Sequence, residues 1–266
     1  MIEPAPPPSP AAPLATDSPA IAAESPAIAG ARGNAALVEL YQEVADCPAC
    51  ALAKTRAQTV PGSGPAPAEV MCIGEAPGAR EDERGMPFIG AAGRYLDELL
   101  AGIAMSRESV HIANVVKCRP PGNRDPAPEE MAACKPFLDR QIALVDPLLI
   151  VTLGRFSMAR WFPGATISRI HGQPELFGDR LVMPMFHPAA ALRRGELRPV
   201  IEADFARIPR LLEEARAARL ERPAGALSSG RGSGMSSAGN SAGSGGAPLD
   251  VAPSAAASPT SQRSLL

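Results

Sequence analysis

Four of the five cysteines have spacings that suit a metal site. Cys47 and Cys50 form a C-x2-C pair, Cys118 directly follows a predicted strand, and Cys134 lies inside the next predicted helix. Four thiolates spaced in this way could hold zinc or an iron–sulfur cluster. Zinc ribbons usually carry two C-x2-C pairs and this chain has one, so the single later cysteines favour a cluster. The alternative is a thioredoxin-like redox pair with two buried free thiols, but that motif follows a strand, whereas Cys47 follows a predicted helix.

The fifth cysteine, Cys72, lies in a short apolar run and is predicted to be a small buried apolar residue. The N-terminus has neither the basic region nor the apolar stretch of a secretory signal. Without an export signal, cysteines favour metal or redox use over structural disulfides.

Three further groups of residues follow predicted strands and could bind a ligand. The segment 74–82 (GEAPGARED) is a Gly/Pro-rich turn that leads to Phe88, an aromatic residue in a predicted loop. Asn114 ends an apolar strand, where a buried amide needs partners at both ends and could read one edge of a nucleobase. His187 ends the last predicted strand, before a proline-started helix. The structural alternatives are a small core under the loop for Phe88, a loop anchor for Asn114 and a structural imidazole for His187.

Alternating strands and helices must position these residues. Apolar runs predict strands at 70–73, 110–116, 148–153 and 181–186, and amphipathic spacing predicts helices at 35–45, 91–104, 128–145 and 200–212, with a short helix ending at Trp161. This alternation is typical of a mostly parallel sheet covered on both faces. Ligands bind such sheets at the carboxyl ends of the strands, where loops begin here at Gly74, Lys117, Gly154 and His187.

The composition divides the chain into three parts. Every Phe, Tyr, Trp, Cys and His lies between Tyr41 and Phe205. Residues 1–33 are rich in Pro, Ala and Ser, and residues 223–266 in Gly, Ser and Ala, so we predict two disordered tails around one domain at 34–222. The net charge of −2 does not support nucleic-acid binding, which must rest on local patches. No apolar run approaches about 20 residues, so we predict no membrane span and no membrane partner.

Taken together, the motifs resemble those of the family 4 uracil-DNA glycosylases over about residues 35–215. The matching segments are GEAPG at 74–78 with Glu81 and Asp82, PFIG at 87–90, Asn114 with KCRPPGNR at 117–124, CKPFL at 134–138 and HPAA at 187–190. The resemblance implies a three-layer α/β/α sandwich around a four-stranded, mostly parallel sheet. It also implies a [4Fe–4S] cluster held by Cys47, Cys50, Cys118 and Cys134, a pattern in which Cys72 has no place.

The resemblance further implies a monofunctional hydrolase that flips uracil out of DNA and cleaves its N-glycosidic bond. In this interpretation Phe88 stacks on the flipped base and Asn114 bonds uracil N3–H and O4. Glu75, Ala76 and His187 complete the uracil-binding set. Cytosine presents the reverse hydrogen-bonding pattern, so a fixed amide would discriminate strongly against it.

Cleavage requires stabilisation of the departing uracil anion. We expect His187 to donate to uracil O2, helped by backbone N–H groups of the 75–78 turn. Glu81, with Glu75 as the other candidate, would polarise the attacking water or stabilise the sugar cation. Glu81 could instead shape the wall near uracil C5 and exclude the methyl group of thymine.

Basic residues near these loops are expected to contact DNA phosphates. The predicted DNA-contacting residues are Lys117, Arg119, Asn123, Arg124, Arg169 and Arg193, with Arg194 beside the last of these. The expected partner is uracil-containing DNA, single- or double-stranded, bound by a monomer in the cytoplasm at the nucleoid. No motif identifies a partner for the tails.

Two related families fit less well. Family 5 enzymes carry a GLAPA-like first motif, against which Glu75 argues. A further relative traps uracil covalently through a histidine in a KRRIH loop between the third and fourth cysteines. Residues 119–133 contain no histidine, and the similar SRIH segment at 168–171 comes after the fourth cysteine, so we predict no covalent trapping.

Two other classes of function stay open on the residues alone. One is a non-catalytic nucleic-acid-binding module, which would not need the carboxylate of Glu81 and the imidazole of His187 in one cleft. The other is a redox protein that cycles a Cys47–Cys50 disulfide and releases no uracil from DNA.

Overall fold

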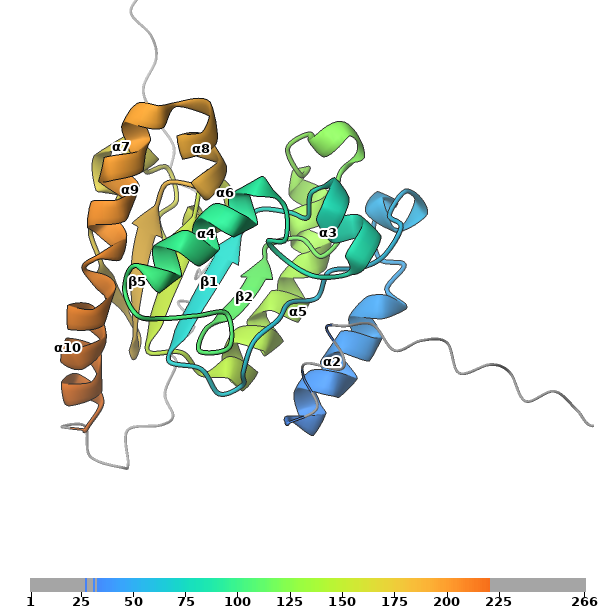
Figure 1. Cartoon of the computed structure of the whole chain (residues 1–266). Helices are drawn as coiled ribbons and strands as arrows, with labels where there is room; N and C mark the ends of the chain where they lie inside the picture. Colours follow the sequence, from blue (N-terminus) through green and yellow to red (C-terminus); the bar gives the residue numbers. More distant parts are fainter. Residues whose placement is uncertain (1–26, 28–30, 32, 221–266) are drawn as a thin grey trace, which may run out of the picture. The chain divides into compact units, whose positions relative to one another are not determined.

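The computed structural model of the chain describes Ala27, Ala31 and residues 33–220 (Figure 1). The predicted tails at 1–33 and 223–266 lie outside these described residues, apart from Ala27, Ala31 and Gly33, so the domain boundaries stay predictions. Within the described part of the chain, no helix is both long enough and apolar enough to cross a bilayer.

Five strands form one sheet in the order β2-β1-β3-β5-β4. β1 (Val70–Gly74) lies between β2 (His111–Asn114) and β3 (Leu149–Leu153) and is parallel to both. β5 (Arg180–Met185) adds a fourth parallel strand beside β3, and β4 (Glu175–Phe177) pairs with β5 in the antiparallel direction. The four parallel strands therefore end at the same edge of the sheet.

Nine α-helices and three 3-10 segments connect and flank the strands within residues 33–220. The α-helices are α2 (Ala35–Ala45), α3 (Ala79–Arg84), α4 (Ala91–Ala101), α5 (Pro128–Val145), α6 (Arg155–Met158), α7 (Ile167–Ile170), α8 (Pro188–Arg193), α9 (Arg198–Phe205) and α10 (Ile208–Leu220). The 3-10 segments are η1 (Ala51–Lys54), η2 (Pro121–Asn123) and η3 (Gly195–Leu197).

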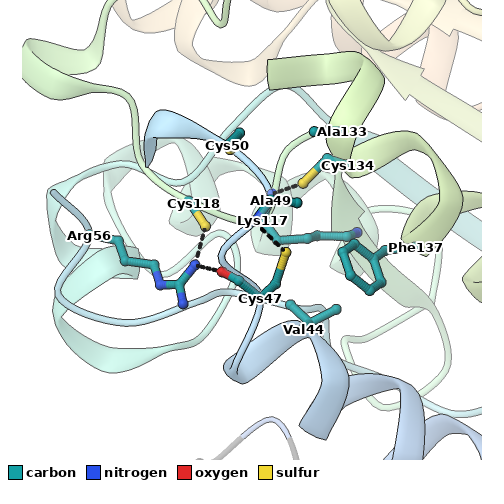
Figure 2. Close-up of a pocket in the computed structure, with 10 residues that line it drawn as sticks. All are labelled: Val44, Cys47, Ala49, Cys50, Arg56, Lys117, Cys118, Ala133, Cys134 and Phe137. Carbon is teal, nitrogen blue, oxygen red and sulfur yellow. Dashed lines mark hydrogen bonds between the residues drawn. The ribbon is translucent and has the colours of Figure 1, made fainter. Parts of the chain in front are cut away.

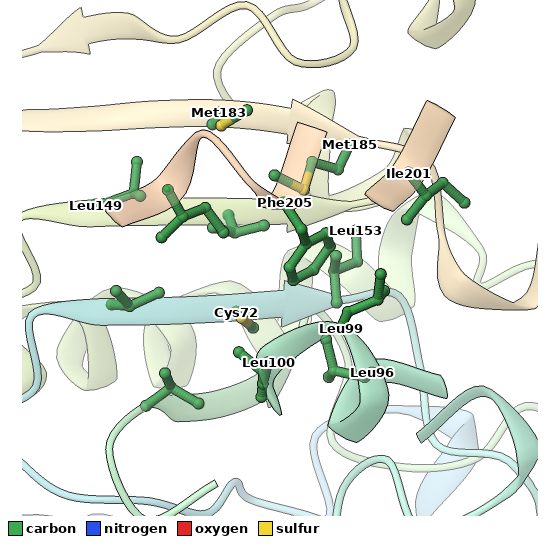
Figure 3. Packing of buried hydrophobic residues seen from close by; sticks show 14 of the residues in the cluster. Cys72, Leu96, Leu99, Leu100, Leu149, Leu153, Met183, Met185, Ile201 and Phe205 are labelled. Carbon is green, nitrogen blue, oxygen red and sulfur yellow. The ribbon is translucent and has the colours of Figure 1, made fainter. Parts of the chain in front are cut away.

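Apolar side chains point to both faces of the sheet because successive residues of a strand alternate in direction. On one face, Cys72 and Leu149 pack with Leu96 of α4 and Phe205 of α9 (Figure 3). Helices α8 and α10 add to the same layer. Cys72 is fully buried there, so its predicted role as a small apolar residue is confirmed.

The opposite face is covered by α5 and α6. Met71 and Ile150 from the sheet pack with Leu138 of α5 and Met158 of α6. Burial of this apolar surface on both faces is the main force that holds the three layers together. The predicted α/β/α sandwich is confirmed.

Helix α2 forms an outer layer on α5, where Leu40 and Tyr41 pack against Phe137 and Leu144. The Asn34 side chain accepts a hydrogen bond from the Leu37 N–H and caps the start of the helix. This packing brings the segment after α2, which carries two of the cysteines, beside the N-terminal half of α5.

The predicted number of strands was wrong, because β4 gives no sequence signal. It has three residues, two of them exposed, so it lacks the apolar run that marks the other strands. Gly178, with φ of 67°, turns the chain from β4 into β5.

Two predicted helices also differ from the structure, one in its end and one in its continuity. The helix predicted at 91–104 stops at Ala101, beyond which Ala104 takes a positive φ of 57°. The helix predicted at 200–212 is two helices, α9 and α10, and Pro209 lies in the first turn of the second. Proline is tolerated there but would break a continuous helix.

Candidate active site

Residues from β1, β2 and the loop before α4 meet above Gly74, the last residue of β1. Gly74 pairs with Asn114 at the end of β2. A Cβ on Gly74 would lie 2.5 Å from Oδ1 of Asn114 and 2.6 Å from Cζ of Phe88. Only glycine therefore fits, and its absent side chain lets the amide and the aromatic ring approach each other.

The Asn114 side chain has a buried acceptor without a partner. The residue is 2% exposed, and its Oδ1 atom makes no hydrogen bond within the described part of the protein. A buried polar atom left unpaired costs about 1–3 kcal/mol, so such an atom in a native fold calls for an explanation. A ligand with an N–H group facing Oδ1 would supply the missing partner.

His187 brings an imidazole to the same place from the end of β5. Its ring stacks on Phe88 with centroids 5.6 Å apart and planes 25° apart. Nδ1 accepts a hydrogen bond from the Ala189 N–H at 3.1 Å, so the proton of the neutral ring lies on Nε2. Burial lowers the pKa of His187 to about 4, and the positive charge of Arg193 acts in the same direction. At neutral pH the site thus presents a neutral Nε2–H donor.

Phe88 is 5% exposed and packs with the main apolar cluster under α4. The predicted alternative of a separate small core under the loop is therefore wrong. Glu81, on α3, holds the segment just after Phe88, because its Oε1 accepts the backbone N–H groups of Ile89 at 2.9 Å and Gly90 at 2.7 Å. Glu81 is 9% exposed and thus acts on the backbone of this loop.

Glu75 and Ala76 follow β1 in the turn that faces the cysteines. Glu75 is partly buried; burial raises the pKa of its carboxyl group, and the negative charge of Asp125 adds to this effect. Ala76 is partly buried and packs against the cluster formed by Leu52, Val116, Cys118 and Cys134. The turn therefore links the end of β1 to the cysteine site.

The four predicted cysteine ligands line one pocket (Figure 2). They come from three separate parts of the chain: Cys47 and Cys50 after α2, Cys118 after β2, and Cys134 in α5. None of the four forms a disulfide. Within residues 33–220, no three His, Cys, Asp or Glu side chains lie close enough to hold a single metal ion.

Hydrogen-bond donors point at three of the four sulfur atoms. Arg56 donates to Cys118 Sγ at 3.3 Å, the Lys117 N–H to Cys134 Sγ at 3.4 Å, and the Ala49 N–H to Cys47 Sγ at 3.5 Å. Such N–H groups favour thiolates and surround iron–sulfur clusters in proteins. Burial raises the pKa of the Cys118 thiol to about 11, while Arg56 opposes this effect.

The buried position of Lys117 does not fit its predicted contact with DNA. The side chain is 2% exposed, and its ammonium group donates to the Asn114 carbonyl oxygen at 2.9 Å and to Gln141 Oε1 at 2.6 Å. Gln141 in turn donates to Tyr41 Oη at 3.0 Å. Lys117 therefore fixes the backbone of Asn114.

The other predicted DNA contacts lie on the surface around the site. Arg119 is partly buried and donates to Oδ1 of the exposed Asn123 at 2.7 Å. Arg124 binds Glu130 through both terminal nitrogens, at 2.9 and 2.6 Å, so its charge is largely balanced within the protein. Arg169 is exposed on α7 and Arg193 at the end of α8.

Two positioning residues escaped the sequence analysis. Gln141 is a polar residue among the buried apolar positions of α5, and this departure from the pattern was a usable signal. Arg107, which donates to the backbone of Phe88, lies in a loop with no motif, and nothing local marks it.

The fold and the two sites define a three-layer α/β protein in which a buried amide, an imidazole and an aromatic ring come together near the ends of the parallel strands. A four-cysteine site lies beside them. The family model described as the uracil DNA glycosylase superfamily matches residues 61–208. The chain therefore belongs to the uracil DNA glycosylase superfamily.

Individual relatives give the same answer. A type-4 uracil-DNA glycosylase of Archaeoglobus fulgidus is 45% identical over 184 residues, which cover 66% of this chain and 92% of the relative. A type-4 enzyme of Thermotoga maritima is 42% identical over 64% of this chain and 91% of its own length. A type-5 uracil-DNA glycosylase of Thermus thermophilus is 36% identical over 38% of this chain and 53% of its own length. The similarity to type-4 proteins is thus both higher and more extensive.

Proposed function

We propose that this protein is a uracil-DNA glycosylase, which hydrolyses the N-glycosidic bond of uracil in DNA and leaves an abasic site to start base-excision repair. The observation that carries the proposal is the buried, unpartnered Oδ1 of Asn114 beside the ring of Phe88. The family membership and the type-4 relatives support it independently.

Base recognition follows from the groups that surround Gly74. Asn114 Oδ1 accepts uracil N3–H and its amide nitrogen donates to O4, while Phe88 stacks on the ring. The turn at Glu75 and Ala76 borders the base. Cytosine offers an acceptor at N3 and a donor at N4, so both bonds are lost and cytosine is rejected.

Cleavage releases uracil as an anion, and His187 stabilises it through a hydrogen bond from Nε2–H to O2. A neutral donor suits this task because its hydrogen bond strengthens as negative charge develops on the base. The low pKa of His187 keeps the ring neutral across the physiological pH range.

A carboxylate is needed beside the sugar, and the contacts favour Glu75 over Glu81 for this role. Glu81 Oε1 is already occupied by two backbone N–H groups, whereas burial raises the pKa of Glu75 and makes it a stronger base. Glu75 would then polarise the attacking water or stabilise the sugar cation, and Glu81 would shape the loop of Phe88.

The cysteine site fits a [4Fe–4S] cluster. In a cluster of this kind each thiolate binds a different iron atom, so the four cysteines surround a common space. Such a cluster does not require three of the cysteines to lie close enough to bind the same metal ion. The N–H donors to Cys47, Cys118 and Cys134 suit the sulfur ligands of a cluster. Its contribution is structural: it ties the segment after α2 to the loop and helix that follow β2.

Uracil-containing DNA is the proposed partner, with Arg119, Asn123, Arg169 and Arg193 as phosphate contacts and Arg124 as a weaker one. We also propose a monomer in the cytoplasm, associated with the nucleoid through its substrate.

Incubation with single- and double-stranded oligonucleotides that carry one uracil, followed by alkaline cleavage of abasic sites, tests the activity. Strand breaks at uracil and none at cytosine or thymine are expected. A His187→Gln variant should slow single-turnover cleavage more than DNA binding. Iron-loaded protein that binds the oligonucleotide without cleaving it would indicate the non-catalytic alternative, and a Cys47–Cys50 disulfide without uracil release would indicate the redox alternative.

Metal analysis tests the cluster separately. Protein purified without oxygen should contain about four iron and about four acid-labile sulfide per chain. Protein that contains zinc alone would refute the cluster proposal while leaving the glycosylase proposal in place.

A further inference from the structure

The backbone of Phe88 lies in the left-handed region, with φ of 53°. Glycine adopts this region freely, but a bulky aromatic residue does so only when its surroundings hold it there. Neighbouring groups must therefore hold the backbone of Phe88 in this unfavourable conformation.

Arg107 is one of these groups. Its NH1 atom donates to the Pro87 carbonyl oxygen at 3.0 Å, and its NH2 atom donates to the Phe88 carbonyl oxygen. Its Nε atom donates to Asp97 Oδ1 at 2.6 Å, which orients the guanidinium from α4. The planar fork of arginine can hold two carbonyl groups and a carboxylate at once, which an ammonium group cannot do.

The same loop is held from two other directions. Glu81 accepts the N–H groups of Ile89 and Gly90, just after Phe88. Gly93 of α4 lies directly against the Phe88 carbonyl group, where any side chain would collide with it. Arg107 thus binds the carbonyl groups of the loop, Glu81 binds its N–H groups, and Gly93 leaves room for the loop to pack closely against α4.

The position of the Phe88 ring depends on this backbone. The ring edge lies against Gly74, and the imidazole of His187 lies beside the ring in a nearly parallel orientation, with centroids 5.6 Å apart. Relaxation of the backbone out of the left-handed region would redirect the ring away from both. The stacking surface for a base would then be lost, although Phe88 itself would be unchanged.

We propose that Arg107 is a positioning residue that holds Phe88 in its left-handed conformation and so builds the stacking surface for the flipped base. The inference rests on the proposed glycosylase function. It assigns Arg107 no contact with the base or with DNA, since three of its N–H groups are used within the protein.

The test compares Arg107→Gln and Arg107→Lys with a matched control, Arg210→Gln. Arg210 lies on α10, where it is paired with Glu214, so its loss removes a guanidinium and an ion pair elsewhere. Each protein is measured for inhibition by free uracil, for kcat and KM on a uracil-containing oligonucleotide, and for affinity to abasic-site DNA at several salt concentrations. Phe88→Ala serves as the reference for complete loss of stacking.

The inhibition constant for free uracil should rise about tenfold in Arg107→Gln and less in Arg107→Lys, since stacking of a base on one aromatic ring contributes an effect of this size. Arg210→Gln should match the wild type. The affinity for abasic DNA and its salt dependence should stay within twofold, because no phosphate contact is removed.

Unchanged inhibition by uracil in Arg107→Gln, with weakened inhibition in Phe88→Ala, would overturn the role of Arg107 and leave the proposed function intact. A shallower salt dependence would overturn it too, since Arg107 would then be a phosphate contact. A loss of kcat alone, with unchanged inhibition by uracil, would also overturn the proposal, because it would show that Arg107 supports the general stability of the protein and not the stacking surface. Wild-type protein that excises no uracil would overturn the proposed function itself, and this inference with it.

Discussion

Replacement of Asn114 by alanine should nearly abolish uracil excision while it leaves the fold as stable as before. Most buried polar residues behave differently, because their truncation strands a partner inside the protein. In Asn114 the acceptor Oδ1 has no partner to strand. The side chain is held for the ligand rather than for the fold.

The expected magnitudes follow from the same observation. Loss of the two hydrogen bonds to uracil leaves two base groups unpaired, at about 1–3 kcal/mol each, so kcat/KM should fall by roughly 10²- to 10⁴-fold. The free energy of unfolding should change by no more than about 1 kcal/mol, because relief of the unpaired acceptor offsets the lost packing.

Single-turnover excision from a uracil-containing oligonucleotide and unfolding in urea measure the two quantities. Thr152→Val is the matched control, since Oγ1 of Thr152 is another buried acceptor without a partner, in β3 on the face covered by α5 and α6. This variant should keep full activity and lose no stability.

Excision by Asn114→Ala within threefold of the wild-type rate would refute the base-reading role. A loss of about 3 kcal/mol or more in stability, with activity reduced only in proportion to the folded fraction, would show that the amide serves the fold instead. The control separates these outcomes from any general effect of removing a buried polar group.

Three further predictions concern stability and the cysteines. Lys117→Met should lower the free energy of unfolding by about 2–5 kcal/mol in urea, because it strands two buried oxygens, and should leave the salt dependence of DNA binding unchanged. Burial lowers the pKa of His111 to about 4, so the unfolded chain takes up the proton first as the pH falls below about 6.5. The His111 contribution should be full above that pH and decline by about 3 kcal/mol as the pH falls through 4. His111→Gln should remove this share and leave the share that His187 contributes, as measured in urea titrations at successive pH values. Cys118→Ala should lose iron and Cys72→Ala should keep it, as measured by metal analysis of protein purified without oxygen.

Much of the fold could be predicted because the parallel strands are buried on both faces and so appear as apolar runs. The same logic located Asn114, whose polar side chain interrupts such a run at its end. Strand β4 could not be found in this way, since its exposed position at the sheet edge imposes no apolar pattern.

The candidate site was predictable where a residue departs from its local pattern and unpredictable where its role depends on distant partners. Lys117 lies beside Arg119 in the sequence and was grouped with it as a surface cation, yet its partner Gln141 lies 24 residues further along the chain. Arg107 contacts the backbone of Phe88, which lies 19 residues earlier in the chain, and Asp97 of α4 orients its guanidinium group. Neither contact leaves a trace in the spacing of nearby residues.

The order of the strands has a consequence for how this protein can change. The chain leaves β1 toward the face covered by α4 and leaves the adjacent β3 toward the face covered by α6. The ends of these two strands, at Gly74 and Leu153, are therefore a point where the connections of adjacent strands run to opposite faces of the sheet, and such points are where α/β proteins of this kind bind ligands. The path of the backbone thus determines where a ligand binds. The side chains around that position determine only which ligand is accepted. A new base specificity could evolve through a few exchanges there, with the sheet and its packed layers left untouched.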